Sequence, residues 1–257
     1  MKKYMMIIII LILAINLFAA DYKDEFKKGV DFYKTDKVDK ALDAFLSIEK
    51  AGIINADVFY NTANCYYRLG KMGMAILYYK KALKVKPDFV KAKKNLEFAM
   101  SLTKDKQDIP KASPVEEFLK GIFNKISINV FALISLLLFA AIILIIVLLI
   151  MRYRGREKTV PIFLLVLFLF IFAFFIVLSY VKWSNYHSDK NAVLISDSAI
   201  GFSGPGESYT RVFTIHEGLC FTVEQTQGEW SLIKLYNGLG GWIRTQEIKR
   251  VKFLASN

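Results

Sequence analysis

Two uncharged apolar runs in the middle of the chain restrict most strongly what it can fold into. They extend from Ile126 to Met151 and from Val160 to Val181, and neither contains an ionisable side chain. Each is longer than the about 20 apolar residues that an α-helix needs to cross a hydrocarbon core of about 30 Å. We therefore predict a membrane hairpin with transmembrane helices over residues 126–151 and 160–182.

The segment between the runs, residues 152–159, predicts the orientation of the hairpin. It carries three arginines and a lysine against a single glutamate. Short basic loops stay in the cytoplasm, so the parts before and after the hairpin are expected outside it. The N-terminus agrees, because Lys2 and Lys3 precede an uncharged run that ends at Ala20. Residues 1–20 thus have the pattern of a signal peptide or, if uncleaved, of a signal anchor.

The net charge of +12 does not indicate a nucleic-acid partner. Part of it belongs to the basic loop, and part to residues 21–103, where lysine and aspartate are interspersed as on a solvated helix surface. Cys65 and Cys220 fall in different soluble segments, and we expect packing thiols rather than a bridge. The two histidines, His187 and His216, have no metal-ligand spacing, so neither a metal nor another cofactor is predicted.

Residues 21–103 contain an internal repeat with a period of about 34 residues. When the segment is aligned with itself at this period, Gly29 coincides with Ala63 and Ala41 with Ala75. Large residues also align around these small ones. We predict two helices per unit and a further helix after Pro87, about two and a half repeats in all. Because such arrays generally need about three repeats to bury a continuous core, we expect this one to lean on a partner, on itself or on the membrane-proximal helix.

The repeat resembles the tetratricopeptide family, more closely in the second unit, residues 56–87, than in the first. The resemblance implies a concave face that binds an extended peptide through aromatic and basic side chains. The alternative is that the aromatic residues form the repeat core. Asn61 and Lys91 match part of a carboxylate clamp, but Phe26 and Val30 stand where that clamp needs polar groups. The predicted face comprises Phe26, Val30, Tyr33, Tyr60, Asn64, Tyr67, Lys91, Lys94 and Phe98.

A polar linker, residues 104–112, precedes an amphipathic helix over residues 113–125. Ser113 and Glu116 have capping-box spacing, and Pro114 suits the first helical position. The apolar stripe of this helix either lies along the membrane interface or packs on the repeat domain as a cap.

Residues 190–254 predict an all-β domain, because short alternating segments are separated by glycine turns. The Gly204-Pro205 turn, His216-Glu217-Gly218 and Gly241-Trp242 resemble the bacterial SH3-like family, which implies a small barrel. Its aromatic residues either line a ligand groove or, as we favour, pack the core; they are Tyr209, Phe213, Trp230 and Trp242. The six expected strands cover residues 192–196, 199–202, 210–215, 219–226, 230–235 and 241–244.

The order of parts, namely exported repeats, a two-span hairpin and an outer SH3-like domain, resembles the Bat proteins of aerotolerance operons, of the BatE type. The resemblance implies a multidomain protein of the bacterial inner membrane, with both soluble domains on the periplasmic side. The implied partners are Bat proteins with von Willebrand factor A domains and, indirectly, a MoxR-type ATPase.

We predict a non-enzymatic scaffold, because the exported segments show neither a nucleophile and base pair nor a phosphate loop. The alternative is a cell-wall anchor whose SH3-like domain binds peptidoglycan and whose repeats recruit cargo.

Overall fold

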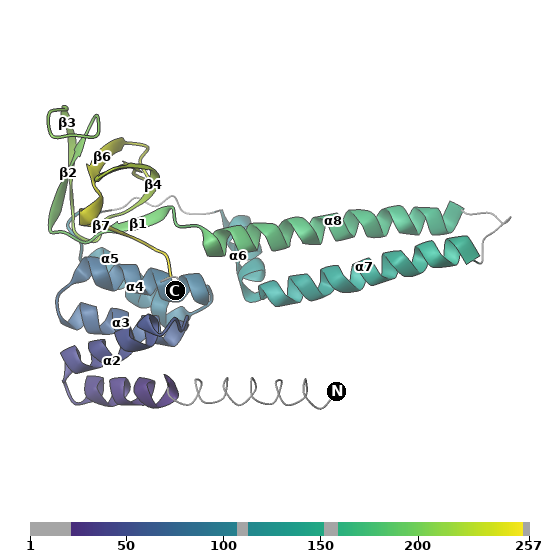
Figure 1. Cartoon of the computed structure of the whole chain (residues 1–257), viewed down its shortest axis with the longest axis horizontal. Coiled ribbons are helices and arrows are strands. Elements are labelled where there is room, and N and C mark those ends of the chain that lie inside the picture. The colour runs from purple at the N-terminus through teal and green to yellow at the C-terminus, as the bar shows by residue number, and fades with distance from the viewer. Residues whose placement is uncertain (1–21, 107–112, 152–158, 254–257) are drawn as a thin grey trace, which may run out of the picture. The chain divides into compact units, whose positions relative to one another are not determined.

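The computed structural model describes residues 22–106, 113–151 and 159–253. The chain forms two compact units. One combines the N-terminal helices with the C-terminal sheet (Met1–Pro110 and Asp189–Asn257), and the other is Lys111–Ser188. The elements are labelled in Figure 1.

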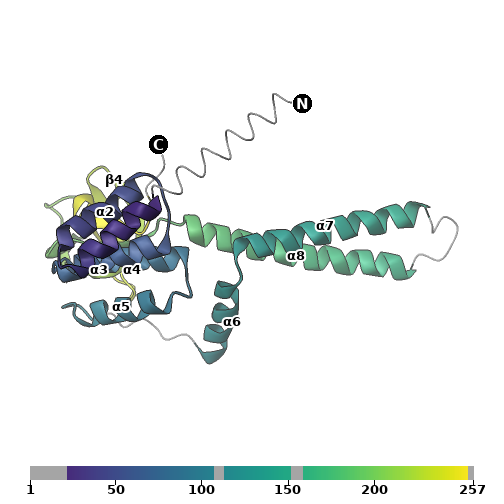
Figure 2. The same cartoon turned by 90° about the horizontal axis from the view of Figure 1, so that it is seen from below.

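The first unit begins with stacked helical hairpins, in which each helix packs on the next in sequence (Figure 2). Asp36 and Gly70 occupy equivalent turns and both adopt the left-handed conformation, with φ of 62° and 73°. Arg68 pairs with Asp36, so one turn supports the other. After a helix over residues 22–34, the helices are α2 (Val38–Lys50), α3 (Ala56–Arg68), α4 (Met72–Val85) and α5 (Val90–Ser101).

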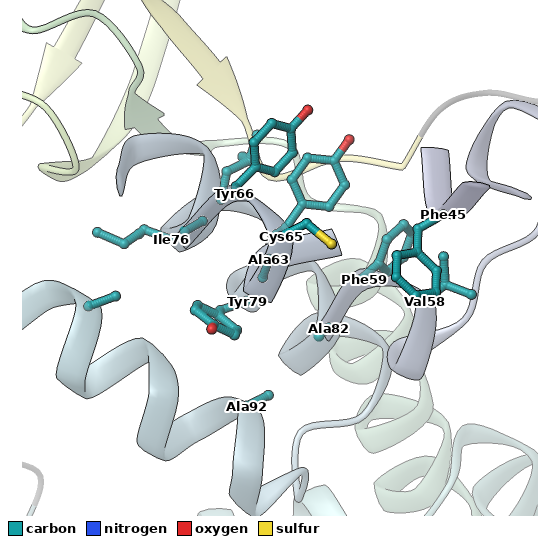
Figure 3. Packing of buried hydrophobic residues seen from close by; sticks show 14 of the residues in the cluster. Phe45, Val58, Phe59, Ala63, Cys65, Tyr66, Ile76, Tyr79, Ala82 and Ala92 are labelled. Atoms are coloured by element: carbon teal, nitrogen blue, oxygen red, sulfur yellow. The ribbon is translucent and has the colours of Figure 1, made fainter. Parts of the chain in front are cut away.

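The core of the helices alternates large and small side chains (Figure 3). Phe45, Phe59 and Tyr79 are almost completely buried. At Gly29 an added Cβ would lie 2.7 Å from a ring carbon of Phe45, so only glycine permits this approach. Ala63 is also completely buried. The small residues on which the repeat pattern rests therefore lie where helices come close together.

The C-terminal segment forms a seven-stranded antiparallel sheet in the order β3-β2-β6-β5-β4-β1-β7. Leu194, Phe221, Ile233 and Ile243 fill its core. Six strands lie where the sequence predicts them, whereas β7 was missed. The bounds are β1 (Asn191–Leu194), β2 (Ser198–Phe202), β3 (Arg211–His216), β4 (Cys220–Gln227), β5 (Trp230–Lys234), β6 (Gly240–Arg244) and β7 (Ile248–Arg250), with a 3-10 turn, η1 (Thr245–Glu247), before β7.

The sheet packs directly on the helices. Val193, Cys220 and Val251 are buried in the same apolar cluster as the repeat core. The amide of Gly73, in the first turn of α4, donates to Glu217 Oε1 at 2.7 Å. The short array thus packs on the C-terminal sheet of the same chain, whereas its support was expected from a partner, from the array itself or from the membrane-proximal helix.

The second unit contains α6 (Pro114–Lys125), α7 (Ile128–Met151) and α8 (Thr159–His187). Ser113 Oγ accepts from the amide of Glu116 at 3.2 Å, as the capping pattern predicts. At the other end of α6, Lys182 Nζ donates to the carbonyl of Phe123 at 2.7 Å and so connects α6 with α8.

Helices α7 and α8 lie side by side in both views (Figures 1 and 2). Within Asn129–Met151 and Thr159–His187, the apolar 18-residue windows have mean hydropathies of 3.5 and 3.3, and both helices are long and apolar enough to cross a membrane. Only 11% of the first apolar window and 0% of the second is buried. A core helix of a soluble protein would be mostly buried, so this exposure favours a lipid environment.

Candidate functional site

Six of the nine residues of the predicted face lie on α3 and α5, and the other three lie on the helix over residues 22–34. A polar cluster joins α3 and α5. Tyr79 donates its hydroxyl hydrogen to Asn64 Oδ1 at 2.6 Å. Asn95 Nδ2 approaches Asn64 Oδ1 and the hydroxyl of Tyr60, both at 3.2 Å. Burial raises the pKa of Tyr79, so this phenol remains a hydrogen-bond donor. The cluster fixes the distance between α3 and α5 and thereby the shape of the face.

A depression of about 410 Å³ opens beside this cluster. Tyr60 contributes one wall and packs on Phe89 with ring centroids 5.1 Å apart. Asn61 and the exposed Lys91 also line it, together with Asp57. Such a surface offers an aromatic contact, an amide and charges of both signs within one concave area, which suits a peptide.

A second aromatic group lies near the other end of the face. The guanidinium of Arg68 stacks 4.9 Å from the ring centroid of Tyr33. Burial raises the pKa of Tyr33, and the charge of Arg68 opposes that rise. Tyr67 contacts Phe98 with centroids 6.1 Å apart, and Phe98 is 56% exposed. An apolar ligand side chain therefore has direct access to this end of the face.

The other residues of the predicted face have different surroundings. Phe26 is half-buried and packs on Phe45 at 5.6 Å, so it belongs mainly to the core. Val30 is also half-buried. Lys94 is exposed on α5. Asn95, which organises the polar cluster, was missed by the sequence reasoning, although its place one turn after Lys91 on the same helix is a usable signal.

The aromatic residues of the sheet form a second surface around small residues. Phe213 lies over Gly201, where an added Cβ would be 2.2 Å from its ring, and Tyr209 lies over Gly204 in the same way. Tyr209 is 50% exposed. The glycines therefore let both rings lie flat against the backbone.

Both tryptophans of the sheet are half-buried. Trp230 meets Phe202 edge to face at 5.6 Å, and Arg244 lies 5.4 Å over its ring. Trp242 is paired with Leu232 and Phe202 on neighbouring strands. The rings thus combine packing with partial access from solvent.

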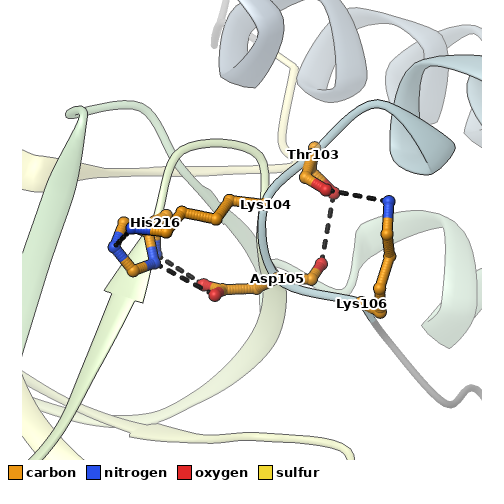
Figure 4. A network of polar contacts seen from close by, with 5 residues as sticks. All are labelled: Thr103, Lys104, Asp105, Lys106 and His216. Atoms are coloured by element: carbon orange, nitrogen blue, oxygen red, sulfur yellow. Dashed lines mark hydrogen bonds and ion pairs between the residues drawn. The ribbon is translucent and has the colours of Figure 1, made fainter.

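The dipeptide His216-Glu217 lies at the junction of helices and sheet (Figure 4). The amide of His216 donates to Asp105 Oδ2 at 2.6 Å, and His216 Nδ1 lies 3.0 Å from Asp105 Oδ1. Lys104 Nζ is 2.8 Å from His216 Nε2. Since an ammonium group can only donate, Nε2 accepts and Nδ1 carries the proton toward Asp105. This network holds the segment after α5 against the sheet.

Comparison with known proteins supports one part of this architecture. The family model of the tetratricopeptide repeat matches residues 56–89, which cover α3, α4 and the turn after α4. No curated protein matches the chain. The chain therefore contains a tetratricopeptide repeat, a module that suggests a role in protein–protein interaction.

Proposed function

We propose that the protein is a membrane-anchored scaffold whose α3 and α5 face binds a segment of a partner protein. The observation that carries this proposal is the depression between Tyr60, Phe89 and Lys91, which lies on the repeat that the family model matches. Its aromatic walls supply contact area with little loss of side-chain entropy, and its lysine can meet a carboxylate.

The anchoring part of the proposal rests on α7 and α8. Their apolar side chains are exposed over most of their length, which is stable in lipid but not in water. The compact unit of repeat helices and C-terminal sheet supports a topology in which both parts lie on one side of the membrane. Because it is built from chain on both sides of the hairpin, the two flanking parts belong on the same side of the bilayer. The basic composition of the loop supports an orientation in which that side lies outside the cytoplasm, because short basic loops stay in the cytoplasm.

The proposed setting is a Bat-type envelope complex in the bacterial inner membrane. The order of modules supports it, and its partners would be membrane proteins with von Willebrand factor A domains, served by a MoxR-type ATPase. The protein would act without catalysis, by holding partners near one another, since tethering raises their effective concentration.

Site-specific crosslinking tests the scaffold. A photoreactive amino acid at Lys91 should capture a partner in intact cells, whereas the same group at Lys40, an exposed lysine of α2, should not. Mass spectrometry then identifies the captured protein. Equal capture from both positions, or capture from Lys40 alone, would contradict a binding face on α3 and α5.

Cell-wall anchoring is the second candidate, favoured by the exposed ring of Tyr209 and the half-buried rings of both tryptophans of the sheet. The full chain in detergent should then sediment with purified peptidoglycan, and Trp242→Ala should reduce the bound fraction while Lys91→Ala should not. Failure of the wild-type chain to sediment with the wall at low salt would end this candidate.

A further inference from the structure

A second cavity lies between α2, α4 and the edge of the sheet, with Tyr66 of α3 also in its lining. Its volume is about 510 Å³, within the range of about 300–1,000 Å³ that is typical of ligand sites. Leu46, Met74 and Leu77 provide apolar lining from the helices. Residues of η1 and β7 provide the other wall, and β7 is an edge strand that pairs only with β1 within the described sheet.

The charge of this cavity is strongly one-sided. Five basic side chains line it against one carboxylate, that of Glu49. Glu49 is 4% exposed and already engaged, since its two oxygens accept from Lys81 Nζ and from the hydroxyl of Tyr78, both at 2.7 Å. The cavity therefore has an unbalanced positive charge. The five basic residues are Lys50, Lys81, Lys249, Arg250 and Lys252.

Three of these cations are available to a ligand. Lys50, Lys249 and Lys252 are exposed, and among the described residues none of them is paired with a carboxylate. Arg250 is partly engaged by Asp189 at 3.4 Å. Burial lowers the pKa of Lys81, the pairing with Glu49 opposes that fall, and the charge of Lys249 adds to it to a smaller extent. A bound anion would relieve this repulsion.

We propose that this cavity binds an acidic segment of a partner protein, in which carboxylates flank an apolar side chain. The charge complementarity selects an anionic occupant, and the apolar lining favours a peptide over a small inorganic anion. The site is separate from the α3 and α5 face, and it gives the scaffold a second docking position that requires helices and sheet together.

Binding of a model peptide tests this proposal. The probe is a fluorescein-labelled hexapeptide in which aspartate alternates with leucine, titrated with the full chain in neutral detergent and followed by fluorescence anisotropy. We expect saturable binding in about the micromolar range that weakens as salt rises. The double variant Lys50→Glu/Lys249→Glu should weaken binding roughly tenfold, because both exposed cations change sign.

The matched control is Lys27→Glu/Lys34→Glu, which reverses two exposed lysines of the first helix and should bind like the wild type. The proposal is overturned by equal losses in both double variants, by no loss in the first, or by no saturable binding up to about 1 mM. Displacement of the peptide by glycerol phosphate, but not by free glutamate, would assign the cavity to a lipid headgroup instead. The Lys91 crosslink is unaffected by any of these outcomes, so the two docking proposals fail separately.

Discussion

At the scale of single residues, the contact between helices and sheet depends on glycines that allow a close approach, to backbone at Gly73 and to side chains at Gly218. An added Cβ at Gly73 would lie 2.4 Å from the carbonyl oxygen of Leu194. At Gly218 it would lie 2.5 Å from Thr103 Cγ2 and 2.9 Å from Ile76 Cδ1. Side chains larger than hydrogen would therefore separate the two parts of this unit.

Substitution of Gly218 measures the strength of this junction. Gly218 has φ of 86° and Gly228 has φ of 56°, but Gly228 has no atom within 4 Å of an added Cβ. Gly228→Ala should cost about 1–2 kcal/mol from the left-handed backbone alone. Gly218→Ala should cost about 1–3 kcal/mol more, because it also overpacks the contact with α4. Urea unfolding of the two variants in detergent gives the difference, and equal costs would show that the junction is loosely packed.

The junction also shows what sequence reasoning cannot find at this scale. The partner of Glu217 is the amide of Gly73, and the partner of His216 is Asp105, each more than a hundred positions away. Local spacing in the sequence therefore could not reveal either contact. The buried pair of Glu49 and Lys81 lies on two helices of different repeats and escaped notice for the same reason.

At the scale of elements, α4 is the helix on which most of the first unit packs. It contacts α3, α5 and β1. It buries Tyr78 and Tyr79, and burial together with the charge of Glu49 raises the pKa of Tyr78. The folded state therefore retains the Tyr78 proton at a pH at which an unfolded tyrosine, with its ordinary pKa of 10.0, has lost it.

This pKa shift predicts loss of stability in alkali. The contribution of Tyr78 is fully present below pH 10.0 and is lost as pH rises above that value, because the unfolded state then binds fewer protons. Burial lowers the pKa of Lys81, so the contribution of this lysine to the free energy of unfolding rises with pH instead. Tyr78→Phe should cost about 1–3 kcal/mol at neutral pH, since Glu49 loses a donor, and should flatten the alkaline decline. Tyr236→Phe, at a more exposed tyrosine of the sheet, should leave the decline unchanged; urea midpoints across this pH range provide the measurement.

Most elements follow from local patterns, and the exceptions have physical reasons. The apolar runs, the repeat and the strands β1 to β6 each carry a period or a turn signal. Strand β7 has only three residues and follows a 3-10 turn, so no alternation is visible. Of the candidate face, the aromatic and basic residues were predictable from the repeat, whereas the depression beside Phe89 depends on how the loop after α4 folds back.

At the scale of the whole molecule, the unit of helices and sheet is assembled from two parts of the chain separated by the apolar hairpin. A hairpin is consistent with this arrangement, because an even number of crossings returns the chain to the side from which it came. A single crossing would leave the sheet across the bilayer from α4.

Cysteine labelling tests this topology. Single cysteines at the exposed Ser101 and Ser208 should react equally with a membrane-impermeant maleimide in spheroplasts, while Arg154→Cys should react only after lysis. The native Cys65 and Cys220 are buried, and burial raises the pKa of the Cys65 thiol to about 12, so the background should be low. Labelling of only one of the two serine positions in intact spheroplasts would contradict a topology in which repeats and sheet lie on the same side of the membrane.

The shared cluster of Val193 and Cys220 with the helices also sets an order of events during synthesis. The repeats leave the ribosome first, the apolar hairpin follows, and the strands of the C-terminal sheet that pack on α4 come last. Until those strands are synthesised, the surface of α4 that they cover stays exposed. A nascent chain that stops within the hairpin cannot cover this surface. The apolar surface of α4 is therefore covered only when synthesis of the C-terminal strands is complete.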